Sequence, residues 1–253
     1  MRATARAEAR PFWFRGFRAF VTPVLQRAAA SRPDLRLLDC GCGTGANVDL
    51  LDMCGRAYGF DLTDVGLRIG LETGRRRLAR ASVTAVPFPT ASFDIVTSFD
   101  VLYALDEEDE RAAIAEMHRL LKPGGCAIVN VAAMPVLRGD HSVLSREVRR
   151  YTRGDLRERL ERAGFVIERL TYTNATLFAP LALSRLLQRR RGLRRESDAD
   201  AEAEITVPPE PINAIMTAVM QAEALWLRWF DAPFGSSLLC LARKPTNPSV
   251  THR

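Results

Sequence analysis

The sequence of 253 residues has no run of about 18 apolar residues, which is the length that a membrane-spanning helix needs. Its first residues, MRATARAEARPFWF, also lack the apolar segment of a secretory signal. Both absences argue against insertion in a membrane and against secretion. Because 47% of the residues are hydrophobic and 26% are charged, as in ordinary globular proteins, we expect a folded cytoplasmic protein.

Cysteine is scarce, and its positions do not suggest pairing. The five cysteines are odd in number and scattered along the chain, which is typical of reduced thiols in the cytoplasm. Two of them, Cys40 and Cys42, stand close together, but no further metal ligands accompany them. We therefore interpret both as small filling residues and expect no metal site.

Lysine is scarcer still, since only Lys122 and Lys244 are lysines among 36 basic residues. A net charge of +6 and an isoelectric point near 9.4 are typical of proteins that bind nucleic acids. Here, however, the arginines are spread over the whole chain, which indicates a general preference for arginine. The sequence therefore does not predict a phosphate-binding face, and it disfavours nucleic acid as a partner.

What the sequence does contain is a regular alternation of strand and helix patterns. The predicted strands are residues 35–39, 56–62, 77–83, 92–100, 126–133, 166–172 and 236–244. The predicted helices between them are residues 45–55, 63–74, 106–125 and 152–165. This alternation predicts a doubly wound α/β fold, in which helices cover both faces of a mostly parallel sheet.

Two further segments flank the predicted core of residues 31–173 and 234–245: an N-terminal helical lid, 1–30, and a helical insertion, 174–233. One predicted helix of the insertion carries apolar residues on one face, namely Ile215, Val219, Ala222, Trp226 and Trp229. Four roles are open for this face. It could cover an apolar acceptor pocket, form a homodimer contact, cap the sheet, or lie peripherally at the inner membrane surface with Arg189, Arg190 and Arg191 at the headgroups.

The stretch LLDCGCGTGAN carries the strongest functional signal. A buried strand ends in Asp39, and Gly41, Gly43 and Gly45 follow at alternate positions before a helix. Glycines at such a turn allow a ligand to contact the backbone beside the helix N-terminus. The next strand ends in Asp61, 22 residues after Asp39, where a carboxylate can accept hydrogen bonds from ribose hydroxyls.

The spacing D-x-G-x-G-x-G resembles the first motif of class I S-adenosylmethionine-dependent methyltransferases, and VTAVPFPTASFDIVTSFDVLYAL with RLLKPGG resembles their type 11 members. The resemblance implies a seven-stranded sheet with an antiparallel last strand, and S-adenosyl-L-methionine as the cofactor. It also implies adenine contacts at Ser82, where aspartate is commoner, and Val83. The cofactor-binding residues that it implies are Asp39, Gly41, Gly43, Gly45, Asp61, Leu62, Ser82, Val83, Phe99 and Asp100.

The segment LRGDHSVLSREVRRYT resembles a subset of this family in which an acidic or His-Asp pair precedes H-x-R-R-Y-T. The resemblance makes His141 and Tyr151 the candidate catalytic residues. Ser142 stands where the subset often has aspartate, and Glu147 stands where it often has histidine. The sequence therefore departs from the subset at two positions beside the candidate acceptor site.

The candidate substrate-binding residues are Trp13, Arg15, Tyr103, Arg149 and Arg150. The two adjacent arginines could clamp a phosphate or carboxylate of the acceptor. The alternative is a salt-bridged helix entry, in which Thr152 caps the helix that follows. Trp13 and Arg15 belong to FWFRGFRAF, which resembles the family's aromatic segment that closes over the cofactor, but which is equally compatible with a core-facing helix stripe.

Methyl transfer from a sulfonium is an in-line displacement, which needs the acceptor atom about 3 Å from the methyl group and water excluded. From the resemblance we predict an S-adenosylmethionine-dependent methyltransferase that acts on a small-molecule or lipid-linked acceptor. Methylation of RNA is one alternative, although SFDVL stands after the fourth strand where amino-methylases carry N-P-P-[YF]. The other alternative is a regulatory module that binds S-adenosylmethionine without catalysis.

Overall fold

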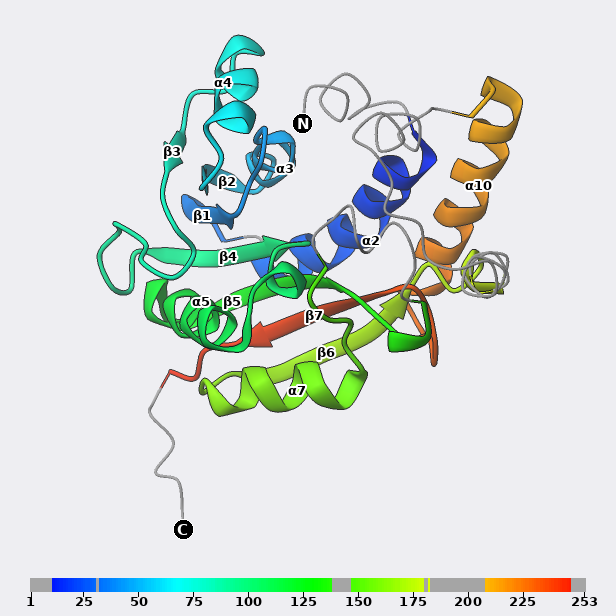
Figure 1. Cartoon of the computed structure of the whole chain (residues 1–253). Coiled ribbons are helices and arrows are strands. Elements are labelled where there is room, and N and C mark those ends of the chain that lie inside the picture. Colours follow the sequence, from blue (N-terminus) through cyan, green and yellow to red (C-terminus); the bar gives the residue numbers. More distant parts are fainter. Residues whose placement is uncertain (1–10, 31, 138–146, 180–181, 183–207, 247–253) are drawn as a thin grey trace.

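The computed structural model describes residues 11–30, 32–137, 147–179, 182 and 208–246 (Figure 1). Several residues singled out above lie outside this description. They are His141, Ser142, Arg189, Arg190 and Arg191. Within the described ranges, no helix combines the length and the apolar character that crossing a membrane requires.

A sheet of seven strands forms the centre of the molecule, in the order β3-β2-β1-β4-β5-β7-β6 (Figure 1). The strands are β1 Leu35–Cys40, β2 Gly55–Asp61, β3 Leu78–Arg80, β4 Phe93–Phe99, β5 Leu121–Ala132, β6 Val166–Thr173 and β7 Ser237–Arg243. Neighbouring strands pair in parallel except β7, which runs antiparallel to both β5 and β6. The predicted doubly wound sheet with an antiparallel last strand is confirmed.

Helices lie on both faces of this sheet. They are α2 Phe12–Ala29, α3 Ala46–Leu51, α4 Asp64–Glu72, α5 Glu107–Leu120, α7 Arg153–Arg162 and α10 Glu210–Trp226. Parallel strands of one sheet normally connect through right-handed crossovers, and in this sheet the chain leaves β1 toward one edge and β4 toward the other. Therefore α3 and α4 cover one face, where α2 packs against α3, and α5 covers the opposite face beside α7 (Figure 1).

The middle strands are mostly apolar because helices cover them on both sides. Leu37, Leu38, Ile95, Val96 and Ile128 have no exposed side-chain surface. Their burial fixes the carboxyl ends of β1, β2 and β4 side by side at one edge. In doubly wound folds, this is the edge at which ligands bind.

Local sequence signals explain where several helices begin and end. Asp106 caps α5 by accepting a hydrogen bond from the Asp109 N–H at 2.9 Å, and four acidic residues follow in the first turn. Strand β5 starts at Leu121, directly after α5, and not at Cys126 as predicted. The Lys-Pro-Gly-Gly stretch follows the end of the helix as expected, but its residues belong to the strand.

Helix α10 buries a different face from the one that the apolar pattern favours. Its buried residues are Asn213, Thr217, Met220, Glu223 and Ala224. Ile215, Trp226 and the following Trp229 are instead exposed, by 63%, 46% and 83%. The predicted apolar face therefore does not pack on the core, because polar anchors on the other face bind α10 to its neighbours.

Candidate functional site

The glycine loop between β1 and α3 has one position that opens to space. A Cβ atom on Gly41 would lie 2.4 Å from Val101 Cγ2, and one on Gly45 would lie 2.9 Å from Leu78 Cδ2. These two glycines therefore permit packing within the protein. Gly43 has a φ of +57°, and a Cβ atom there would meet no atom of the described residues within 4 Å. Gly43 is thus the glycine of the loop that leaves room for a ligand against the backbone.

Asp61, at the end of β2, ties the glycine loop to the neighbouring strand. Its Oδ2 accepts a hydrogen bond from the Gly43 N–H at 2.8 Å. Its Oδ1 accepts from the N–H and the hydroxyl of Thr63, at 2.8 and 2.5 Å. Because a carboxylate offers about four lone-pair sites, the half-buried Asp61 retains capacity for a further donor beside Gly43.

Asp39 is the buried counterpart of Asp61 on β1. Its Oδ1 accepts a hydrogen bond from the Thr97 hydroxyl at 2.7 Å, whereas Oδ2 has no hydrogen-bond partner in the described structure. Burial raises the pKa of this carboxyl to about 7, and the nearby Asp61 carboxylate adds to the shift. Asp39 is thus a carboxyl that the fold holds largely out of contact with water.

The predicted adenine side consists of an exposed apolar residue and a short polar turn. Leu62 is 62% exposed, and its carbonyl accepts a hydrogen bond from Arg80 Nε at 3.2 Å. The Ser82 hydroxyl lies 2.8 Å from the Thr84 hydroxyl and accepts from the Thr84 N–H at 3.2 Å. Val83, between them, is half-buried. This edge offers an apolar surface and hydroxyl groups in place of the family's usual carboxylate.

The residues after β4 are held by the neighbouring strand. Asp100 adopts a left-handed backbone with a φ of +60°, which is uncommon for a residue other than glycine. Its N–H donates to the Asn130 carbonyl at 3.0 Å, and Asn130 Nδ2 donates to Asp100 Oδ1 at 2.9 Å. Two contacts from β5 therefore hold the carboxylate of Asp100 in place. Our sequence reasoning missed Asn130, although a polar residue within CAIVNVAA was a visible signal.

The N-terminal helix α2 reaches this same edge. The ring of Phe17 packs edge-on against Phe99, with 5.1 Å between the ring centroids. Trp13 is half-buried and packs edge-on against Phe12, while Arg15 is exposed. Our sequence reasoning placed Trp13 and Arg15 near the site but missed Phe17, which directly contacts a predicted cofactor residue.

Tyr103 and the segment that enters α7 form the predicted acceptor side. The Tyr103 carbonyl accepts hydrogen bonds from the N–H groups of Val148 and Arg149, at 2.9 and 3.2 Å. Burial raises the pKa of the Tyr103 phenol, and the carboxylates of Asp100 and Glu147 raise it further. The phenol is therefore neutral at physiological pH and able to donate a hydrogen bond.

Both adjacent arginines of this segment are already paired within the protein. Arg150 forms an ion pair with the buried Glu147 and donates to the Ala133 carbonyl at 3.0 Å. Arg149 forms an ion pair with Glu110, whose side chain is fully buried. These contacts favour the salt-bridged helix entry over a free anion clamp.

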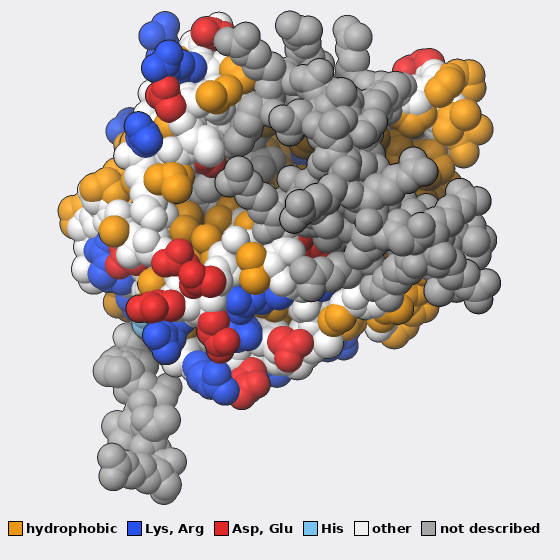
Figure 2. All heavy atoms as spheres, in the orientation of Figure 1, with side chains coloured by type: hydrophobic (Ala, Val, Ile, Leu, Met, Phe, Trp, Pro, Cys, Tyr) orange, Lys and Arg blue, Asp and Glu red, His pale blue; other side chains and the backbone are white. Residues whose placement is uncertain are grey.

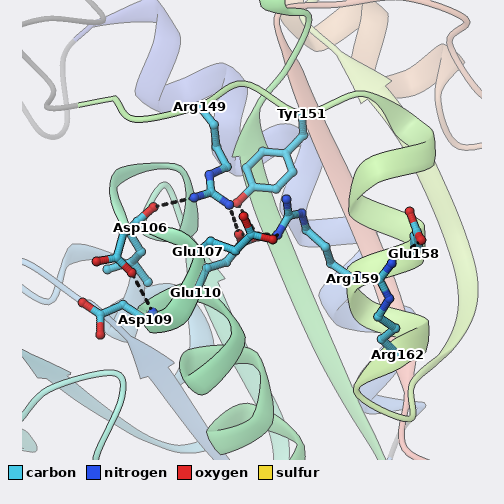
Figure 3. Close-up of polar contacts among 10 residues, drawn as sticks. Asp106, Glu107, Asp109, Glu110, Arg149, Tyr151, Glu158, Arg159 and Arg162 are labelled. Atoms are coloured by element: carbon cyan, nitrogen blue, oxygen red, sulfur yellow. Dashed lines mark hydrogen bonds and ion pairs between the residues drawn. The ribbon is translucent and has the colours of Figure 1, made fainter.

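Glu110 of α5 is the centre of that helix entry (Figure 3). Its Oε1 accepts a hydrogen bond from the Tyr151 hydroxyl at 2.6 Å, and its Oε2 lies 2.8 Å from Arg159 Nη1 as well as contacting Arg149. Burial, together with the hydrogen bond to Glu110, raises the pKa of Tyr151. The structure therefore places Tyr151 in a buried polar cluster between α5 and α7.

The cap predicted for α7 is present. The Thr152 hydroxyl accepts a hydrogen bond from the Asp155 N–H at 3.2 Å, and the Asp155 carboxylate accepts from the Thr152 N–H at 3.1 Å. These reciprocal bonds form a capping box. The segment that joins the predicted acceptor side to α7 is thus held in place by contacts of Arg149, Tyr151 and Thr152.

A cavity of about 350 Å³ lies apart from the glycine loop, between α5 and α7. Its lining residues are Glu107, Glu110, Arg111, Ile114, Ala115, Arg159, Arg162 and Ala163. It shares no lining residue with the loop, and we assign the functional site to the carboxyl ends of the strands, where Gly43 and Asp61 meet. Among the described residues, no cluster of three or more histidine, cysteine or acidic side chains could hold a metal ion.

Comparisons with known proteins show a likeness to methyltransferases. The family model of the type 11 methyltransferase domain matches residues 38–129. A ubiquinone/menaquinone biosynthesis C-methyltransferase, UbiE, from Shewanella halifaxensis is 30% identical over 189 residues, which cover 59% of this chain and 72% of that protein. A protein from Mycolicibacterium smegmatis, named as a probable S-adenosylmethionine-dependent methyltransferase, is 29% identical over 161 residues. That match covers 62% of this chain and 60% of that protein's length.

A solved structure extends the likeness of the fold. The [4+2]-cyclase SpnF has a TM-score of 0.57 and 21% sequence identity, over 90% of this chain and 81% of that one. Since its name describes a cyclase, the shared fold does not by itself assign a reaction.

Proposed function

This chain belongs to the class I S-adenosylmethionine-dependent methyltransferases of type 11, with S-adenosyl-L-methionine as the cofactor, and from that premise we propose that it methylates a small-molecule acceptor. The observation that carries the proposal is the open space at Gly43, beside a half-buried Asp61 with remaining hydrogen-bonding capacity. Both lie at the carboxyl ends of parallel strands, where this fold binds ligands.

In this proposal the cofactor lies along the strand ends. Asp61 would accept a hydrogen bond from a ribose hydroxyl, and Gly43 would allow the ligand to approach the loop backbone. Leu62 and Val83 contact the adenine ring, and Ser82 offers it a hydroxyl. Phe99 and Asp100 face the methionine end, where the carboxylate of Asp100 complements the positively charged amino group.

S-adenosylmethionine supplies a methyl group activated by a positively charged sulfur, so the leaving thioether needs no proton from the protein. The residues of this chain must bind the acceptor in line with the methyl group and exclude water. We assign the exclusion of water to Trp13 and Phe17 of α2, and acceptor contacts to Tyr103, Arg15 and His141. Tyr103 can donate a hydrogen bond to an acceptor oxygen from its neutral phenol.

The buried contacts of the helix entry suggest a supporting role for the other predicted residues. Tyr151 and Arg149 are bound to Glu110, and Arg150 is paired with Glu147. We therefore propose that these three residues position the acceptor segment, and that Tyr151 does not exchange a proton with the acceptor. The name of the Shewanella relative, a C-methyltransferase, supports carbon as the acceptor atom.

The outward face of α10 supports a lipid-linked acceptor that is reached at a membrane surface. Figure 2 shows hydrophobic side chains over α10, and Trp226, Trp229 and Phe230 are all more than 40% exposed. Exposed aromatic rings favour the interface of a bilayer, and the net charge of +6 would attract an anionic bilayer.

Flotation with anionic vesicles should carry the wild type but not a Trp226→Ser/Trp229→Ser variant. Equal recovery of both in the unbound fraction, with a dimeric mass in solution, would favour a homodimer contact.

The cofactor site is tested by calorimetric titration with S-adenosylhomocysteine. We expect saturable binding that Asp61→Ala weakens at least tenfold, about 1.4 kcal/mol. Asp64→Ala is the matched control, because Asp64 lies three residues away and forms a surface pair with Arg68. It should bind as the wild type does. Equal affinity in all three proteins would remove Asp61 from the site.

Turnover is a separate question from binding. Incubation with S-adenosylmethionine labelled in the methyl group, together with small-molecule extracts, should transfer the label to an acceptor. Transfer to purified RNA instead would favour the RNA alternative. Tight binding with no transfer to either would favour the regulatory module.

A further inference from the structure

Helix α2 reaches the predicted methionine end, and no neighbouring residue in the described part of the chain caps its start. Pro11 precedes it without a side-chain hydrogen bond, and its first turn contains no acidic residue. The first N–H groups of a helix need acceptors from elsewhere. Here the Phe12 N–H donates to Asn213 Oδ1 at 2.8 Å, 201 positions later in the chain. Asn213 is fully buried, so α10 caps α2 from outside.

The two helices also touch without a gap at the next turn. A Cβ atom on Gly16 would lie 2.2 Å from Met220 Cε and 2.5 Å from Met220 Sδ. Met220 is 2% exposed, so its side chain fills the space that glycine leaves. The pairing of Gly16 with Met220 therefore sets how closely α2 approaches α10, and the helices pack side by side in Figure 1.

Helix α10 is in turn anchored to the sheet, so it provides a fixed support. The buried Glu223 accepts hydrogen bonds from the Ala175 N–H at 2.8 Å and from the Thr176 N–H and hydroxyl at 3.0 and 2.6 Å. Arg169 of β6 forms an ion pair with Asp231 and donates to the Leu227 carbonyl at the end of α10. Both contacts connect α10 to β6 or to the chain that directly follows it.

The opposite side of α2 faces the site. Phe17 contacts Phe99, and Arg18 Nη2 lies 3.5 Å from the carbonyl of Ala46, at the start of α3. From Phe12 to Phe17 the helix rises only about 7.5 Å. A displacement at the cap is therefore transmitted over little more than one turn to the ring that covers Phe99.

We propose that Asn213 is a positioning residue, whose cap of α2 places Phe17 and Trp13 over the methionine end of the cofactor. In this view α10, which belongs to the helical insertion, sets the position of α2, which belongs to the N-terminal helical lid. The inference rests on the proposed cofactor site, but its test separates the two. Asn213 is not among the residues that we assign to the cofactor or the acceptor, and it acts through the start of α2.

The test compares Asn213→Leu, which removes the acceptor at similar volume, with Asn213→Asp, which retains it at a helix N-terminus. Both are made in a Trp226→Phe/Trp229→Phe background, so that Trp13 is the remaining tryptophan. We expect Asn213→Leu to bind S-adenosylhomocysteine about tenfold more weakly and to lose the change in Trp13 emission on binding. Asn213→Asp should stay within twofold of its background.

Thr152→Ala is the matched control, because it removes a cap from α7. It should lower the Tm but leave the affinity and the Trp13 response unchanged. If Asn213→Leu behaves like Thr152→Ala, Asn213 is only structural and the proposal is wrong. If the background protein itself does not bind, the proposed function fails. The cap is then judged from the Trp13 emission of the free proteins, which must differ between Asn213→Leu and Asn213→Asp.

A second pair of variants covers the case in which Asn213 variants do not fold. Gly16→Ala places a methyl group against Met220, which should displace α2 and weaken binding. Adding Met220→Ala relieves the collision and should restore the affinity. Weakening without any rescue, or no weakening at all, would contradict the role of α10 in placing the lid.

Discussion

The two sides of the binding edge hold their residues in different ways. On the cofactor side, Gly43 and Asp61 are 18 positions apart, and Ser82 bonds to a residue two positions away. On the acceptor side, Tyr151 bonds to Glu110 across 41 positions, and Arg159 bonds to the same glutamate across 49. The contact between Gly43 and Asp61 thus joins consecutive strand-to-helix units, whereas these acceptor-side contacts require more distant segments to meet.

The two sides also differ in where they keep their charges. Asp61 is half-buried and keeps capacity for a ligand, whereas Glu110 and Glu147 are buried and paired with arginines. A paired buried charge stabilises one arrangement of segments and is costly to break. We therefore expect substitutions on the cofactor side to change ligand affinity, and those on the acceptor side to change stability.

Substitution of Asp39 should have the largest effect on the free energy of unfolding. It is an exception to this comparison, because Asp39 lies on the cofactor side and its ionisation destabilises the folded protein. Its pKa is raised from an ordinary 3.8 to about 7, so the folded state favours the protonated acid. The protonated Asp39 therefore makes its full contribution to the free energy of unfolding below about pH 4, and this contribution is lost as the pH rises through 7. From pH 4 to 8, Asp39→Asn should therefore gain on the order of 4 kcal/mol relative to the wild type.

This difference is measured by urea denaturation of both proteins at each pH, so that all other titrations cancel. Parallel profiles for the wild type and Asp39→Asn would show that Asp39 ionises normally in the folded protein.

Glu110→Ala should give the next largest effect and sharpen the comparison. The substitution leaves Arg149, Arg159 and the Tyr151 hydroxyl without their shared acceptor. We expect a loss of about 3 kcal/mol in the free energy of unfolding, with the affinity for S-adenosylhomocysteine unchanged. Glu110→Gln keeps an acceptor oxygen and should lose less. A large loss of affinity in the folded variant would contradict the separation of the two sides.

Gly43→Ala tests the cofactor side against a matched position. Gly43 and Gly74 both have a positive φ, and neither has an atom within 4 Å of an added Cβ. Each substitution to alanine should therefore cost about 1 kcal/mol of stability. In addition, Gly43→Ala should weaken S-adenosylhomocysteine about tenfold by calorimetry, whereas Gly74→Ala should not. Equal affinities would mean that the open space at Gly43 is not part of the site.

The smallest effect is expected from a surface pair on the acceptor side. Arg157 and Glu161 of α7 form an ion pair at 3.2 Å with both side chains 47% exposed. Glu161→Gln should lower the free energy of unfolding by no more than about 0.5 kcal/mol, and less at high salt. A loss as large as that of Glu110→Ala would show that burial is not what separates the two ion pairs.

Much of the core was predictable because its signals are local. The mostly parallel α/β sheet follows from alternating strand and helix patterns, and the caps at Asp106 and Thr152 follow from residues within one turn. The inward face of α10 was not predictable in this way. Apolar periodicity favoured Ile215, Trp226 and Trp229, but Asn213 and Glu223 face the protein because they supply acceptors to distant N–H groups.

The sequence by itself determined the sheet, the glycine loop and the placement of Asp61, because each depends on spacing within one strand-to-helix unit. Only the tertiary structure decided that Gly43, and not Gly41 or Gly45, opens to space, because Val101 and Leu78 occupy the other two positions. It likewise decided that Tyr151 is buried against Glu110 and that Asn213 caps α2. Such contacts join residues far apart in the chain, and a buried polar group takes whichever partner the fold brings to it.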